Sequence, residues 1–132
     1  MAALMQGPAM SNYNVAKAGV VALSESLLAE LKPKGVRVHV VCPSFFQTNL
    51  LDSYRGPTTS MKSQFSKLLE SSPISAADIA DYMYQRIEQG EFMILPHEHS
   101  RAAWAMKQSN PQAIYDEMEQ MGLRMRAKLT QA

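Results

Sequence analysis

The residues best suited to chemistry are a tyrosine and a lysine, Tyr13 and Lys17, four positions apart in SNYNVAKAGVVALSESLLAEL (11–31). On a helix this spacing places both side chains on one face. A free phenol titrates near pH ~10, and a neighbouring ammonium favours its ionised form, so such a pair can exchange a proton with a substrate. With five tyrosines and seven lysines in the chain, about 0.3 such spacings arise by chance, so the pair alone is weak evidence.

The segment that carries the pair is expected to be a helix. Residues 11–31 are rich in alanine and leucine, which are strong helix formers. Ser11 or Asn12 is expected to cap the N-terminus of this helix. Pro33 cannot continue the helix and Gly35 suits a C-terminal turn, so the helix is predicted to stop there.

A strand is expected directly after this helix. Residues 36–42, VRVHVVC, are rich in valine, and Pro43 ends the run. A helix, a short glycine turn and a valine-rich strand form the second half of a β-α-β crossover. The sequence therefore predicts an α/β fold with a parallel sheet.

The rest of the chain predicts further helices and one more strand. Residues 61–70 and 100–108 have helical patterns, and residues 91–96 (EFMILP) read as a strand. Ser75 and Asp78 form a capping-box pattern that opens another helix. The last helix begins after the N-cap Asn110 and Pro111. Its apolar stripe is expected to dock on the body and comprises Ile114, Met118, Met121, Met125 and Leu129.

The order of these features resembles the C-terminal half of the short-chain dehydrogenase/reductase family. The resemblance is carried by a Tyr-x-x-x-Lys helix, then PKGVRV, then a strand that ends in Cys-Pro, followed by Phe46 and Thr48; residues 75–96 continue it. It implies that Tyr13 is the general acid/base and that Lys17 also binds the nicotinamide ribose. It further implies that four residues at the strand end contact the cofactor: Pro43, Ser44, Phe46 and Thr48. Here Ser44 replaces the family's usual glycine, and Phe46 replaces an aliphatic residue.

The resemblance also implies a domain organisation. The fold class is a partial Rossmann-like, doubly wound parallel sheet. Residues 1–96 would be the second half of an NAD(P)-binding domain, with a substrate lid at 49–73. Residues 97–132 would be a helical extension packed on this half-domain.

Two parts of such an enzyme are not found in this sequence. The six glycines are at least 12 positions apart, so no glycine-rich dinucleotide loop can form. The family's catalytic serine, about thirteen residues before the tyrosine, would fall just before Met1. The chain is therefore expected to be the second half of an enzyme of about 250 residues, and to be inactive alone. The alternative is a truncated product that acts as a binding or oligomerisation module.

The implied partners are an alcohol or carbonyl substrate, NAD or NADP, and further copies of the full-length enzyme. A formal net charge of +1 gives no reason to expect nucleic acid or a membrane. The single cysteine, Cys42, suits a reducing compartment and a cytoplasmic location. His97 and His99 flank Glu98, but residues two apart on a helix face different ways, so no metal site is expected.

Overall fold

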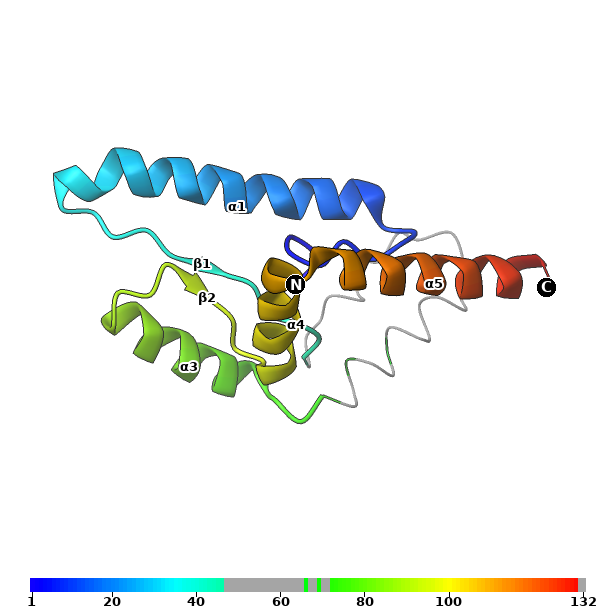
Figure 1. Cartoon of the computed structure of the whole chain (residues 1–132). Helices are drawn as coiled ribbons and strands as arrows, with labels where there is room; N and C mark the ends of the chain where they lie inside the picture. The colour runs from blue at the N-terminus through cyan, green and yellow to red at the C-terminus, as the bar shows by residue number, and fades with distance from the viewer. Residues whose placement is uncertain (47–65, 67–68, 70–71, 131–132) are drawn as a thin grey trace.

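The structure is a computed structural model that describes residues 1–46, 66, 69 and 72–130, with side chains described as far as Ala127. Its helices and strands, in chain order, are α1 (Ser11–Leu31), the short 3-10 helix η1 (Lys32–Lys34), β1 (Val40–Val41), α3 (Ala76–Glu88), β2 (Met93–Ile94), α4 (Glu98–Ser109) and α5 (Pro111–Thr130) (Figure 1).

The two strands form a parallel pair, as the sequence predicts. Val40 lies opposite Met93 and Val41 opposite Ile94. The backbone N–H of Cys42 donates to the carbonyl of Ile94 at 2.9 Å. The parallel pair with its helices is a partial α/β fold of the Rossmann-like kind.

Both strands are shorter than predicted. β1 covers only the end of the 36–42 segment, and β2 covers only the middle of 91–96. The carbonyl of Glu91 bonds the His39 imidazole Nδ1 at 2.6 Å. The described ladder bonds begin at Val40, whose backbone N–H donates to the Phe92 carbonyl at 2.8 Å.

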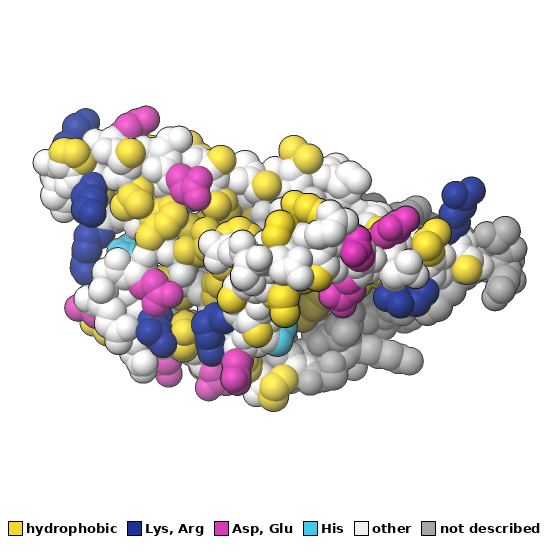
Figure 2. Space-filling view, in the orientation of Figure 1, with side chains coloured by type: hydrophobic (Ala, Val, Ile, Leu, Met, Phe, Trp, Pro, Cys, Tyr) yellow, Lys and Arg dark blue, Asp and Glu magenta, His cyan; other side chains and the backbone are white. Residues whose placement is uncertain are grey.

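Helices lie on both sides of the strand pair. In Figure 1, α1 runs along one side and α3 along the other. The central hydrophobic cluster lies between the strands, α1 and the N-terminal segment, and consists of Leu4, Val21, Val40, Cys42 and Leu95. Figure 2 shows hydrophobic side chains gathered between α1 and the elements below it. Burying this apolar surface holds α1, and with it the Tyr-Lys pair, against the sheet.

The bounds of α1 agree with the sequence prediction, whereas its N-cap residue does not. Helix α1 has the expected bounds, but its N-cap residue is Met10 and no side chain caps it. Ser11 and Asn12 are not caps because both already lie inside the helix. At the other end, Gly35 has a φ of 76°, the left-handed conformation that glycine adopts most easily.

The start of α3 is fixed by a complete capping box. The Ser75 hydroxyl accepts from the Asp78 backbone N–H at 3.2 Å. The Asp78 carboxylate accepts from the Ser75 backbone N–H at 2.8 Å. The Ser75 hydroxyl also donates to this carboxylate, at 2.6 Å; this bond and the bond from the Ser75 N–H lower the pKa of Asp78, because both favour its ionised form. The predicted N-terminus of this helix is therefore confirmed.

We expect Ser75→Ala to reduce the free energy of unfolding by about 1 kcal/mol, because the Asp78 backbone N–H loses its acceptor and the Asp78 carboxylate loses the bond from the Ser75 hydroxyl. Urea denaturation followed by circular dichroism measures the change. Ser26→Ala is the matched control: Ser26 is exposed in the middle of α1, so we expect less than about 0.5 kcal/mol. Equal losses in the two variants would contradict a capping role.

Helix α4 begins earlier than predicted, and helix α5 begins where it was predicted. α4 starts at Glu98 rather than Ser100, because His97 takes the N-cap position. α5 starts at Pro111, and the Asn110 side chain accepts from the Ala113 N–H at 3.4 Å. Within the apolar stripe of α5, Ile114 is buried, Met118 and Met125 are half-buried, and Met121 is exposed.

Other predictions fall largely outside the described residues. Of the predicted helix 61–70, Ser66 and Leu69 are described, and both are helical. Of the predicted lid 49–73, Ser72 and Pro73 are described as well. Among the described helices, none is both long and apolar enough to cross a membrane.

Candidate active site

Tyr13 and Lys17 lie one turn apart at the start of α1, as their spacing predicts. The Lys17 ammonium lies over the Tyr13 ring, 5.4 Å from its centroid. Tyr13 is 39% exposed, and Lys17 is also exposed. Within the described part of the chain, neither the Tyr13 hydroxyl nor the Lys17 ammonium has a hydrogen-bonding partner.

The start of α1 is tied to the N-terminal segment. Asn14, next to Tyr13, is buried, and its side-chain amide donates to the Gly7 carbonyl at 2.8 Å. Lys107 of α4 donates to the Leu4 carbonyl at 2.6 Å. Partial burial lowers the pKa of Lys107. These bonds restrict how the helix that carries Tyr13 can move relative to the sheet.

The N-terminal amine is bonded to the end of β1 and is affected by the charge of Lys17. The Pro43 carbonyl accepts from the Met1 ammonium at 2.6 Å. The pKa of this amine is lowered mainly by burial, with Cys42 acting in the opposite sense and the positive charge of Lys17 adding to the lowering. Lys17 and Pro43 are thus near the same amine, at the edge where the parallel strands end.

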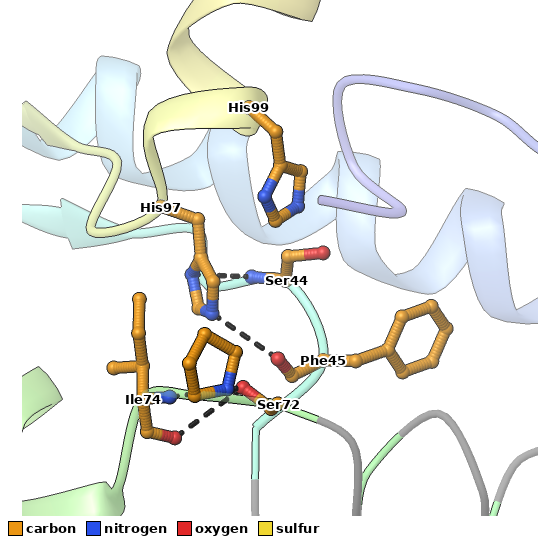
Figure 3. A pocket seen from close by; sticks show the side chains of 7 residues that line it. Ser44, Phe45, Ser72, Ile74, His97 and His99 are labelled. Atoms are coloured by element: carbon orange, nitrogen blue, oxygen red, sulfur yellow. Dashed lines mark hydrogen bonds between the residues drawn. The ribbon is translucent and has the colours of Figure 1, made fainter.

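The backbone after Pro43 is bound by a histidine that the sequence did not single out for this role. The His97 Nδ1 accepts from the Ser44 backbone N–H at 3.2 Å, and Nε2 lies 3.1 Å from the Phe45 carbonyl oxygen. Figure 3 shows the imidazole between these two groups. His97 is only 2% exposed.

The environment of His97 favours its neutral form. Burial is the main cause that lowers the pKa of His97; the Phe45 carbonyl acts in the opposite sense, and His99, the N-terminal amine and Arg101 add to the lowering. The bond from Ser44 requires an unprotonated Nδ1, so the proton resides on Nε2 and is donated to Phe45. The His99 ring lies edge-on to the His97 ring, with the two ring centroids 5.3 Å apart. The two side chains were expected from the sequence to face different ways on a helix, but His97 precedes the helix.

His97 and the strand-end loop border a pocket of about 240 Å³. Its lining comes from three segments and comprises Ser44, Phe45, Ser72, Pro73, Ile74, His97 and His99. Of the residues assigned to the cofactor by resemblance, Pro43, Ser44 and Phe46 are half-buried, and Thr48 lies outside the described residues. No cluster of three potential metal ligands occurs in the described ranges.

A signal for His97 does exist in the sequence. It directly follows Pro96, which closes the second predicted strand, just as Ser44 follows Pro43 at the end of the first. Carboxyl ends of neighbouring parallel strands meet at one edge of the sheet. This juxtaposition could have indicated a contact between His97 and the 44–46 loop.

The strand pair flanked by helices places the chain among α/β proteins that carry a Rossmann-like sheet. Residues 1–58 match the short chain dehydrogenase family profile. A solved short chain dehydrogenase/reductase from Burkholderia phymatum, in complex with NAD, superposes with a TM-score of 0.71 and 26% identity. That match covers 85% of this chain and 45% of the other.

Curated relatives are also reductases or dehydrogenases by name. The 3-oxoacyl-acyl-carrier-protein reductase of Synechocystis is 36% identical over 53 residues, which is 40% of this chain and 22% of the relative. The CLA biosynthesis dehydrogenase/reductase of Lactiplantibacillus plantarum is 27% identical over 114 residues, with 74% and 40% covered. The chain is thus similar to short-chain dehydrogenases/reductases in residues 1–58 and in fold, and it spans less than half the length of these relatives.

Proposed function

We propose that the chain carries the proton-transfer and nicotinamide-side half of an NAD(P)-dependent oxidoreductase that interconverts an alcohol and a carbonyl compound. The observation that supports this most is the Tyr13–Lys17 pair, whose polar groups have no partner among the described residues. The charge of Lys17 also acts on the amine that bonds the Pro43 carbonyl after β1. The relatives' names support the same class of reaction.

Tyr13 is the proposed general acid/base. In the reduction direction, its hydroxyl donates a proton to the substrate carbonyl oxygen, and in oxidation the phenolate accepts the proton of the alcohol. The Lys17 ammonium over the ring stabilises the phenolate by charge. Bound nicotinamide would supply or accept the hydride.

The described groups suit a nicotinamide cofactor. The Lys17 ammonium offers three donors to ribose hydroxyls, and Tyr13 lies beside it. The loop at Pro43, Ser44 and Phe46 offers backbone groups at the carboxyl end of a parallel strand, where ligands bind in such folds. Thr48 is proposed to extend this contact. The described residues do not distinguish NAD from NADP.

The remainder of the cofactor site is proposed to lie upstream. A glycine-rich loop and a serine next to Tyr13 would be contributed by a segment before residue 1; we refer to the chain with this segment as the extended protein. We propose that residues 1–96 are half of its NAD(P)-binding domain, with a lid at 49–73, and that residues 97–132 pack on it. The extended protein is proposed to be a cytoplasmic homo-oligomer.

Substituting Lys17 in the extended protein tests the proposed cofactor and proton-transfer roles together. We expect Lys17→Met to lower kcat/KM by about 10²-fold or more, because the phenolate loses its nearest positive charge. We also expect a higher KM for the cofactor. Lys34→Met, in η1 at the far end of α1, is the matched control and should stay within about twofold of the unsubstituted enzyme. Equal kinetics for the two variants would refute the role of Lys17.

A further inference from the structure

His97 is the one imidazole in the described residues that bonds the backbone of the strand-end loop. Each ring nitrogen of His97 bonds a different backbone group: Nδ1 bonds the Ser44 N–H at 3.2 Å, and Nε2 bonds the Phe45 carbonyl at 3.1 Å. It lies at the end of β2, so the bonds connect the ends of the two parallel strands. A buried ring with both nitrogens engaged has little freedom to rotate, and so it fixes the loop backbone.

Resting on the proposed function, we infer that His97 is a positioning residue for the cofactor: its neutral imidazole holds Ser44 and Phe45 in the loop shape that meets the nicotinamide. Protonation breaks this arrangement, because an Nδ1–H would face the Ser44 N–H, donor against donor. Cofactor affinity should then fall as the pH falls, through a group that does not itself touch the cofactor.

The charges around His97 set the direction of this pH dependence. From α4 the facing groups are His99 and Arg101, and from the N-terminal segment the Met1 ammonium; all three disfavour an imidazolium. The loop and the described lid residues that line the pocket contribute no titratable side chain.

The pKa of His97 in the folded chain is below its ordinary value of 6.5. Between these two pKa values the unfolded chain binds more protons than the folded chain. The stabilisation by neutral His97 is therefore complete above pH 6.5 and is lost as the pH falls through the folded-state pKa.

The first test uses residues 1–132 and needs no cofactor. Nuclear magnetic resonance of a ¹⁵N-labelled sample should find Nδ1 unprotonated and Nε2 protonated at neutral pH. The protection of the Ser44 amide against hydrogen exchange, relative to its intrinsic rate at each pH, should fall as His97 becomes protonated. Protonated Nδ1 at neutral pH, or unchanged Ser44 protection while His97 titrates, would overturn the inference.

Two substitutions separate the bond from general packing. His97→Leu should reduce Ser44 protection by up to about tenfold, because the N–H loses its acceptor. His97→Asn offers an oxygen near the position of Nδ1 and does not titrate, so it should retain protection and remove the pH dependence. His99→Gln, at the neighbouring exposed histidine, is the control: it should retain protection at neutral pH and the loss of protection at low pH, with the midpoint moved to higher pH because one group that lowers the pKa of His97 is removed. Equal Ser44 protection in the Leu and Asn variants would count against the bond; if the Leu variant does not fold, the Asn variant and the wild-type titration decide.

The cofactor step is measured in the extended protein. His97→Leu should raise the KM for NAD(P) several-fold with a smaller change in kcat, and His97→Asn should restore it. If the unsubstituted protein bound no NAD(P), the proposed function would fail, together with the cofactor step inferred here, whatever the exchange data showed. If it bound NAD(P) and His97→Leu left this KM unchanged, the inference alone would fail.

Discussion

Replacing Tyr13 by phenylalanine in the extended protein is expected to lower kcat by about 10²- to 10⁴-fold, the usual contribution of a positioned general acid/base. Phenylalanine keeps the ring that lies 5.4 Å from the Lys17 ammonium and removes only the hydroxyl. The cofactor dissociation constant should therefore stay within a few-fold. Steady-state kinetics with NAD(P)H and calorimetric titration of the cofactor measure the two quantities separately.

The control for this substitution is Tyr84→Phe. Tyr84 is on α3 and is 66% exposed, so removing its hydroxyl should leave kcat within about twofold. A Tyr13→Phe enzyme as active as the Tyr84→Phe enzyme would show that another group transfers the proton. Loss of cofactor binding in the Tyr13 variant would instead point to a binding role for the hydroxyl.

The second large effect concerns the chain alone. Residues 1–132 are expected to show no measurable NAD(P)H-dependent carbonyl reduction, because a misplacement of reacting groups by about 1 Å can already cost about 10²-fold. Without a glycine-rich loop, the chain cannot hold the pyrophosphate in register. Absorbance of NADPH during incubation with a panel of carbonyl compounds measures this directly, with the extended protein as the active control.

Turnover by the isolated chain would refute the division of the cofactor site that we propose.

The isolated chain should also self-associate, because within the described residues β1 pairs with β2 alone, which leaves one edge of β1 unpaired. Sedimentation at several concentrations measures this association. A monomer at all concentrations would speak against both edge pairing and the alternative of an oligomerisation module.

Features of this fold that depend on neighbouring residues could be predicted from the sequence. Helix α1, the left-handed turn at Gly35 after η1 and the capping box at Ser75 each depend on propensities and hydrogen bonds within a few positions. The parallel strand pair was also predicted, because a helix followed by a short turn and a valine-rich strand permits few arrangements.

Features that depend on distant contacts could not be predicted in the same way. His97 bonds backbone groups more than 50 positions away, and the sequence indicates this contact only through the shared place of His97 and Ser44 after strand-ending prolines. The contact of His39 with the Glu91 carbonyl is likewise made across the fold. The N-cap of α1 was misassigned because Ser11 and Asn12 are suitable caps by type, whereas both lie inside the helix and Met10 is the N-cap residue.

The most direct test of the proposed site is a crystal structure of the extended protein with bound NAD or NADP. We expect the Lys17 ammonium at hydrogen-bonding distance, about 3 Å, from the nicotinamide ribose hydroxyls. The nicotinamide carboxamide should contact the backbone of the 43–48 loop, and the Tyr13 hydroxyl should face the nicotinamide. A cofactor bound elsewhere, with Lys17 and Tyr13 in solvent, would contradict the assignment of this edge of the sheet as the active site.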